Sequence, residues 1–164
     1  MQAIRTIVSA AALSVFMLLA SGPAHAQEPA QQISASPFLL MYEYFNVEFE
    51  HRATTASTWG VSTSFAPGHN SSYRNVGGFW HYYPGGRALQ GFYIGGRVQV
   101  HRASGLNASA TLGGVGFELG KNWVIGRRTL VGLGVGVTRL FGGPLAGESL
   151  TLPMFRIANI GIAF

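Results

Sequence analysis

Hydrophobic and polar residues alternate along most of this chain from about residue 31 to its last residue, and short runs of Gly, Pro, Asn and Ser interrupt the alternation. A period of two is typical of β-strands with two different faces, and the interruptions are typical of turns. The pattern predicts an all-β fold with strands at Phe45 to Arg52, Ser57 to Phe65, Arg74 to Tyr83, Leu89 to Arg102, Ala108 to Ile125, Leu130 to Phe141 and Phe155 to Phe164.

An eighth strand is needed if this sheet closes into a barrel, because single-chain bacterial barrels have an even number of antiparallel strands. Residues Gln32 to Met41 can supply it if the chain reverses around Tyr42-Glu43-Tyr44. That turn contains no Gly, Asn or Asp, so residues 37 to 52 forming one long bent strand is the alternative. We expect an eight-stranded antiparallel up-and-down transmembrane β-barrel.

The composition of the two strand faces indicates which face points inward. In the segment Leu130 to Thr138, every second residue from Val131 is Val or Leu, and the residues between them are Gly or Thr. A strand face that meets water would not be lined with glycine. The interior of an eight-stranded barrel is just wide enough for side chains to fill, so inward glycines would make room for large polar groups on facing strands. The apolar face then points outward into lipid.

The same parity places charged side chains inside the barrel. We predict an interior polar cluster made of Glu48, Glu50, Arg97 and Glu118, with His81 and His101 near it. These charges have to be paired, because burying an unpaired ion costs several kcal/mol. We interpret the cluster as a polar core that holds the barrel rigid, since eight strands leave no open channel. A proton-sensitive plug or a narrow gated path is the alternative.

Arginines at the outer ends of the predicted strands fall on the outward face: Arg74, Arg102, Arg139 and Arg156. Arginine on the lipid face costs about 2 to 4 kcal/mol at the midplane of the bilayer and little near the interface, so these residues belong at headgroup height. A guanidinium group can bind two phosphate oxygens at once. We hypothesise that the four arginines bind lipopolysaccharide phosphates. The alternative is that they only end their strands in water.

The first residues resemble a secretory signal peptide. Arg5 precedes an apolar stretch from Ile7 to Ala20, and Pro23-Ala24-His25-Ala26 supplies a cleavage site with small residues. We therefore expect residues 1–26 to be removed and residues 27–164 to form the barrel domain. An exported barrel of this kind is expected in the bacterial outer membrane.

Composition supports a surface that faces lipid. Only 10% of the residues are charged, whereas 48% are hydrophobic and 23 are glycine. Soluble domains carry about 25% charged residues, so this chain has too few charges to cover a surface in water. The net charge of +5 comes mainly from scattered arginines rather than a basic stripe, so we expect no nucleic-acid partner. The chain has no cysteine, so no disulfide is possible.

Catalytic and metal motifs are weak. The glycines from Gly132 to Gly136 lie inside a predicted strand, whereas a dinucleotide fingerprint needs them at a turn into a helix. The histidines do not have the spacing of metal ligands. An enzyme acting on lipid A needs a nucleophile, a base and an acid on the lipid-facing wall; His51 faces outward but lies toward the periplasmic end, and no His-x-Ser-Asn arrangement occurs. We expect no cofactor, no metal and no enzymatic activity.

The end of the chain resembles the closing strand and assembly signal of outer-membrane barrels, with Ile160, Ile162 and Phe164 on one face. The segment Pro37 to Arg52, the phrase Gly91 to Gly95 and the glycine-rich hairpin Thr111 to Arg139 together resemble a bacterial family of small outer-membrane proteins, of the barrel size of OmpA and OmpX. That resemblance implies a barrel fold and an outer-membrane location, and it implies no particular activity.

The function expected from the sequence is that of a non-enzymatic integral barrel without an open pore, which contributes to membrane integrity or to surface interactions. Periplasmic chaperones and the barrel assembly machinery would insert it, and its partners in the membrane would be lipid and lipopolysaccharide. One alternative is an adhesin or binding protein that uses the loops Ala66 to Ser72 and Gly142 to Pro153. The other is a barrel enzyme that modifies lipid A.

Overall fold

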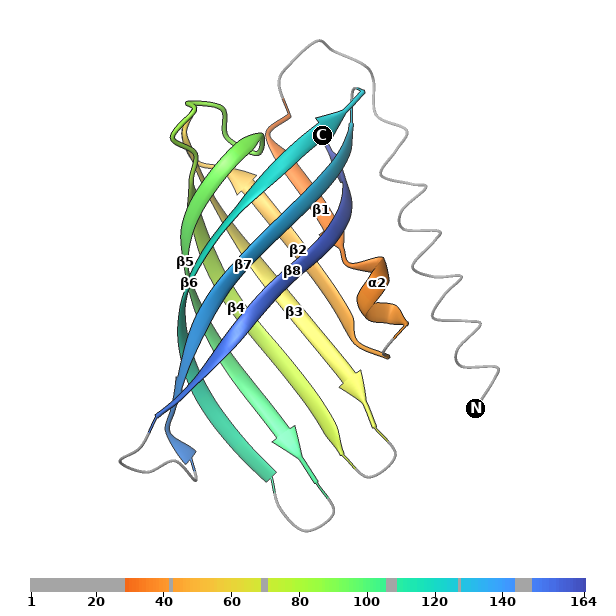
Figure 1. The fold of residues 1–164 in the computed structure, drawn as a ribbon, viewed down its shortest axis with the longest axis vertical. Coiled ribbons are helices and arrows are strands. Elements are labelled where there is room, and N and C mark those ends of the chain that lie inside the picture. Colours follow the sequence, from red (N-terminus) through yellow and green to blue (C-terminus); the bar gives the residue numbers. More distant parts are fainter. Residues whose placement is uncertain (1–28, 42, 69–70, 106–108, 127, 144–148) are drawn as a thin grey trace.

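A computed structural model describes residues 29–41, 43–68, 71–105, 109–126, 128–143 and 149–164. Within these residues, eight antiparallel strands follow one another around a closed barrel (Figure 1). The strands are β1 (Gln31–Ala35), β2 (Phe45–Arg52), β3 (Ser57–Pro67), β4 (Ser72–Tyr82), β5 (Gly91–Ser104), β6 (Ser109–Ile125), β7 (Thr129–Phe141) and β8 (Leu150–Ala163). The eight-stranded barrel predicted from the sequence is confirmed, and the predicted signal peptide lies outside the described residues.

The barrel has two ends that differ in their connections. At one end, here called the turn end, lie the β2–β3, β4–β5 and β6–β7 connections together with Phe164. At the other, the loop end, lie the β3–β4, β5–β6 and β7–β8 connections. The predicted loop Ala66 to Ser72 is shorter than expected, because β3 and β4 stay paired as far as Pro67 and Ser72. Residues 69–70, 106–108 and 144–148 lie outside the described residues.

The first strand is shorter than predicted. The sequence predicts a strand from Gln32 to Met41, but β1 ends at Ala35 and a short helix, α2 (Pro37–Leu40), follows it. Proline has no N–H group for a strand ladder, and its fixed φ suits the first turn of a helix. The chain then reverses through Glu43, whose φ is 57°, and enters β2. The alternative prediction, one bent strand over residues 37 to 52, is therefore wrong. Tyr42 itself lies outside the described residues.

The last strand is longer than predicted. β8 begins at Leu150, so part of the expected loop Gly142 to Pro153 belongs to a strand. β8 pairs with β7 as far as Leu150, but it pairs with β1 only from Ile160 to Ala163. Pro153 thus lies in a part of β8 with a strand on one side only, and proline is tolerated in such edge positions because it cannot donate to a ladder.

This unequal pairing leaves a seam in the wall, defined here as the region between residues 150–159 of β8 and residues 45–46 of β2. The strand β1 does not extend into the seam, and α2 lies beside it instead (Figure 1). The Ser36 hydroxyl donates a hydrogen bond of 2.8 Å to the Ile157 carbonyl and so fixes the start of α2 against β8. At the seam, α2 rather than a strand ladder therefore lies against β8.

A β-bulge interrupts β8 beside the seam. Gly132 of β7 faces Asn159 and Gly134 faces Arg156, so two residues of β8, Ile157 and Ala158, lie opposite one residue of β7. Ala158 has a φ of 44°. An extra residue in a strand shifts the alternation of its side chains by one position. Counting alternate residues back from Phe164 therefore assigns the wrong face to the residues of β8 between the bulge and the loop end.

The barrel has a polar inside and an apolar outside. Among the described residues, 17 buried side chains are polar or charged and 8 are hydrophobic. Glu50 is completely buried, whereas Val98 is 61% and Phe117 is 51% exposed. This distribution is the reverse of that in a soluble domain and confirms that the apolar face of the wall points outward. No described helix is long and apolar enough to cross a membrane.

Inward glycines make room for large polar side chains, as predicted. Gly120 and Gly134 lie opposite each other on β6 and β7, and a Cβ atom on either would contact the Tyr93 hydroxyl, at 2.5 and 2.6 Å. A Cβ atom on Gly136 would lie 2.9 Å from Cβ of Glu118. The Tyr93 ring and the Glu118 side chain therefore occupy space that only glycine leaves free.

Candidate functional site

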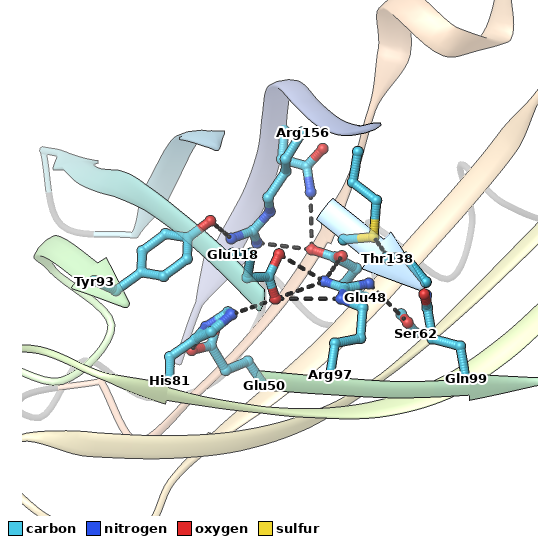
Figure 2. A network of polar contacts seen from close by, with 12 residues as sticks. Glu48, Glu50, Ser62, His81, Tyr93, Arg97, Gln99, Glu118, Thr138 and Arg156 are labelled. Carbon is cyan, nitrogen blue, oxygen red and sulfur yellow. Dashed lines mark hydrogen bonds and ion pairs between the residues drawn. The ribbon is translucent and has the colours of Figure 1, made fainter. Parts of the chain in front are cut away.

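Arg97 of β5 lies at the centre of an ion network that crosses the barrel interior (Figure 2). Its Nη2 donates to Oε1 of Glu48 on β2 and to Oε1 of Glu118 on β6, both at 3.0 Å. Its Nη1 donates to the Ser62 hydroxyl of β3 at 3.1 Å. Arg97, Glu48 and Glu118 are all at least nine-tenths buried. The structure thus brings together these three members of the predicted cluster.

Arg156 of β8 is a further member, and its predicted outward position is wrong. It is 7% exposed, its Nη2 lies 2.8 Å from Oε2 of Glu48, and its Nη1 donates to the Tyr93 hydroxyl at 3.0 Å (Figure 2). The bulge at Ala158 is the physical reason, because it turns the side chain from the outer face to the inner one. A local signal existed in the sequence, since the apolar Phe155 and Ile157 flank Arg156 and both point outward.

His81 of β4 links Glu118 to a third carboxylate, Glu50. Its Nδ1 lies 2.9 Å from Oε1 of Glu50, and its Nε2 lies 2.8 Å from Oε1 of Glu118. A neutral imidazole can donate through only one nitrogen, so the second contact requires a further proton on the ring or on a carboxyl group. Glu50 also accepts hydrogen bonds from Gln32 and Thr58, and from the Tyr83 hydroxyl.

His101 is buried but does not join the ion network. Its Nδ1 lies 2.6 Å from the Tyr73 hydroxyl and 2.9 Å from Nδ2 of Asn75. Gln99 donates to Oδ1 of the same Asn75 at 3.3 Å. Of the two histidines expected near the carboxylates, the structure therefore places His81 among them and His101 in a separate group, without a carboxylate, nearer the loop end.

The ion network ties together strands that are far apart in the sheet. Its charged members come from β2, β4, β5, β6 and β8: Glu48, Glu50, His81, Arg97, Glu118 and Arg156. The three carboxylates face two guanidinium groups and one imidazole, so nearly all charges are compensated inside the barrel. Such an arrangement fills and braces the interior, since removing one partner would leave an uncompensated buried charge.

Two of the outward arginines form a pair. Arg74 of β4 and Arg102 of β5 lie directly opposite each other in the ladder, and both side chains are exposed. The Arg74 guanidinium lies over the Phe65 ring of β3, 5.4 Å from its centre, which is on the side of β4 away from Arg102. Like charges directly opposite on neighbouring strands destabilise a sheet. An anion held between the two guanidinium groups would offset this repulsion.

Arg139 of β7 is outward and exposed but stands apart from this pair. It lies opposite Thr151, and its Nε donates to the Ser149 hydroxyl at 3.0 Å. The four arginines predicted as one set are therefore a pair, one separate exposed residue and one buried residue, Arg156.

A pocket of about 340 Å³ lies inside the barrel, between the ion network and the loop end. Arg97, Glu118 and Arg156 line its inner part. Its walls combine polar side chains such as Asn75, Gln99 and His101 with apolar ones such as Leu39, Leu140 and Leu152. Within the described ranges, no group of three or more His, Asp or Glu side chains is arranged to hold a metal ion.

The residues of the predicted assembly signal lie at the junction of β8 and β1. Ile160 and Phe164 are exposed, Ile162 is partly exposed, and the Phe164 carbonyl accepts hydrogen bonds from the amides of Ala30 and Gln31 at 2.9 and 2.8 Å. Their role in assembly stays a prediction.

Comparison with known proteins gives no relative of this chain, since no protein-family model, curated protein or solved structure matches it.

Proposed function

We propose that this protein is an integral barrel of the bacterial outer membrane, with its turn end toward the periplasm and its loop end toward the outside. The observation that carries this proposal is the reversed distribution of side chains, with ion pairs buried and large apolar residues exposed around the wall. Transmembrane barrels have such an apolar outer band, flanked by aromatic girdles. Near the turn end, exposed aromatic residues supply one girdle: Trp59, Trp80, Tyr82 and Trp123.

The barrel contributes to membrane integrity rather than to transport. The ion network fills the middle of the lumen, and eight strands enclose only enough space for side chains. Its insertion would use periplasmic chaperones and the barrel assembly machinery, with Ile160, Ile162 and Phe164 as the recognised edge. The sequence segments that resemble small outer-membrane proteins, Pro37 to Arg52 and Thr111 to Arg139, imply the same location.

The surface interaction that we assign to this barrel is with lipopolysaccharide. Arg74 and Arg102 form an exposed pair of like charges at the loop end of the wall. Arginine binds phosphate oxygens in a bidentate manner, and a phosphate between the two side chains would turn their repulsion into two attractive contacts. Arg139 has no such partner among the described arginines and serves as the comparison.

The membrane placement is tested by fractionating cells and by running the protein unboiled and boiled on a gel. We expect the protein in the outer-membrane fraction, with a mobility that shifts on heating, because intact barrels resist unfolding by the detergent in the gel. A protein that is monomeric in buffer without detergent or lipid would contradict the placement.

The lipopolysaccharide contact is tested with the double variant Arg74→Gln/Arg102→Gln and the matched control Arg139→Gln. We expect the double variant to copurify with less lipopolysaccharide and to leave a deletion strain sensitive to large hydrophobic antibiotics. The control should behave like the wild type. Equal amounts of lipopolysaccharide on all three proteins would refute the role of the arginine pair, while the membrane placement would stand.

A further inference from the structure

The pocket at the loop end is large enough for a small molecule. Ligand pockets usually have volumes of about 300 to 1,000 Å³, and this one measures about 340 Å³. It is bounded on the inside by Arg97 and Arg156 and on the side of the seam by Leu39 of α2 and Tyr44. Its size suits a single sugar ring or a short hydrocarbon chain better than a whole lipid.

Two buried polar atoms around this pocket lack hydrogen-bond partners among the described residues. Arg156, although 7% exposed, has no acceptor for its Nε–H group, and Oε1 of Gln99 has no donor. Leaving a buried donor or acceptor unpaired costs about 1 to 3 kcal/mol, so each atom would gain from a partner. Both residues line the pocket, but neither atom has accessible surface, so a ligand that bonds to them has to displace neighbouring side chains. The partner has to accept a hydrogen bond at one place and donate one at another.

The charge of the pocket favours an uncharged ligand. Arg97 and Arg156 contribute two positive charges at its inner end, and Glu48 and Glu118 contribute two negative charges that are already paired with them. An anion would meet the two carboxylates, and a cation would meet the two guanidinium groups. A hydroxyl group both accepts and donates hydrogen bonds without adding charge.

The rest of the pocket is suited to hydrocarbon. Leu140 of β7, Leu152 of β8 and Leu39 of α2 line it, and the rings of Tyr44 and Tyr73 are stacked 6.1 Å apart at its edge. Apolar walls with a few convergent polar groups are typical of binding sites for small molecules. The pocket therefore has a polar inner end and an apolar side next to the seam.

We propose that this pocket binds a small uncharged amphipathic molecule that bears hydroxyl groups, of the class of the short alkyl glycosides. Its hydroxyl groups accept from Nε of Arg156 and donate to Oε1 of Gln99, and its hydrocarbon part lies against the leucines. The binding goes beyond the proposed role in the membrane and involves neither Arg74 nor Arg102, which lie on the outer face.

Hexyl β-glucoside is the probe, added to the protein in phosphatidylcholine nanodiscs. The two methionines of the described residues give a direct readout when their methyl groups carry ¹³C. Met154 lines the pocket, whereas Met41 is 80% exposed on the outside and reports only on probe dissolved in the lipid. We expect a saturable shift of the Met154 signal and no saturable shift of the Met41 signal.

The variant Leu152→Trp narrows the pocket, and Leu150→Trp is its matched control. Leu150 lies two positions away on the same face of β8 but does not line the pocket. We expect about a tenfold weaker affinity for Leu152→Trp and an unchanged affinity for Leu150→Trp, with the heat-dependent gel mobility showing that both variants are folded. If Leu152→Trp does not fold, Gln99→Leu takes its place.

The charged analogues hexanoate and hexylammonium test the class of ligand. We expect both to bind at least about tenfold more weakly than hexyl β-glucoside. The proposal is overturned if Met154 shows no saturable shift, if the pocket variant binds as well as the wild type, or if either charged analogue binds as tightly as the glucoside. None of these results would bear on the location of the barrel in the membrane.

Discussion

Arg156 and Arg97 each hold one oxygen of the same carboxylate, that of Glu48: Oε2 lies 2.8 Å from Arg156 and Oε1 lies 3.0 Å from Arg97. β8 supplies the first guanidinium group and β5 the second, so one carboxylate links distant parts of the wall. The barrel is therefore cross-braced through its interior as well as joined by its ladders.

Replacing Arg156 by Met should destabilise the barrel by about 3 to 5 kcal/mol, because the change leaves a buried carboxylate with one cation fewer. Urea unfolding in detergent micelles measures this difference in the free energy of unfolding. Arg139→Met is the control, since Arg139 is exposed and its loss should cost less than about 1 kcal/mol. If both variants lose the same free energy of unfolding, Arg156 does not contribute to the ion network.

Ala158→Gly should leave the stability unchanged or raise it by up to about 1 kcal/mol. A left-handed backbone costs about 1 to 2 kcal/mol for a residue with a Cβ atom, and Ala158 has a φ of 44°. Glycine removes this cost but loses about 0.5 to 1 kcal/mol through its greater freedom in the unfolded chain. Ala110→Gly, in a regular part of β6, should only destabilise, by about 0.5 to 1 kcal/mol. Equal destabilisation of both variants would argue against the bulge.

Gly120→Ala should destabilise the barrel by about 1 to 3 kcal/mol, because the new methyl group would be forced against the Tyr93 hydroxyl and the Leu133 carbonyl. Gly96→Ala is the matched control, since a Cβ atom there meets nothing within 4 Å. The comparison uses the midpoint of unfolding in urea. If both variants unfold at the same urea concentration, Tyr93 does not occupy the space beside Gly120.

Arg102→Gln should stabilise the barrel by about 0.2 to 1 kcal/mol in detergent free of lipopolysaccharide, because it removes the repulsion from Arg74. With added lipopolysaccharide the wild type should become more stable than the variant, since a ligand stabilises the protein that binds it more tightly. Thermal unfolding followed by gel mobility, with and without lipopolysaccharide, gives both differences. A variant that is less stable than the wild type under both conditions would argue against repulsion within the pair.

The sequence alone predicts the strand bounds and the faces of the side chains correctly where the strands are regular. β2 has the predicted bounds, Phe45–Arg52, and the parity of its residues correctly put Glu48 and Glu50 inside. Alternation is a reliable guide there because a strand without irregularities keeps each side chain on one face from end to end. The outward positions of Arg74, Arg102 and Arg139 follow from the same rule.

Prediction failed where one residue breaks the regular count. Alternation counted back from Phe164 assigns the correct face as far as Asn159. It assigns the wrong face from Ile157 toward Leu150, because the bulge adds one residue to β8. The local pattern of Arg156 between two apolar residues was the better guide. The helix α2 was missed although Pro37 marks its start, since the apolar run that follows fits a strand or a short helix equally well.

The short ladder between β1 and β8 has a mechanical consequence. Only four residue pairs join these strands, whereas fourteen join β5 and β6. Force or heat that strains the cylinder evenly will part its shortest row of hydrogen bonds first, so unrolling should start where the first and last strands meet. The interior ion pair between Glu48 and Arg156 lies just beyond that row and would be the next restraint to give way.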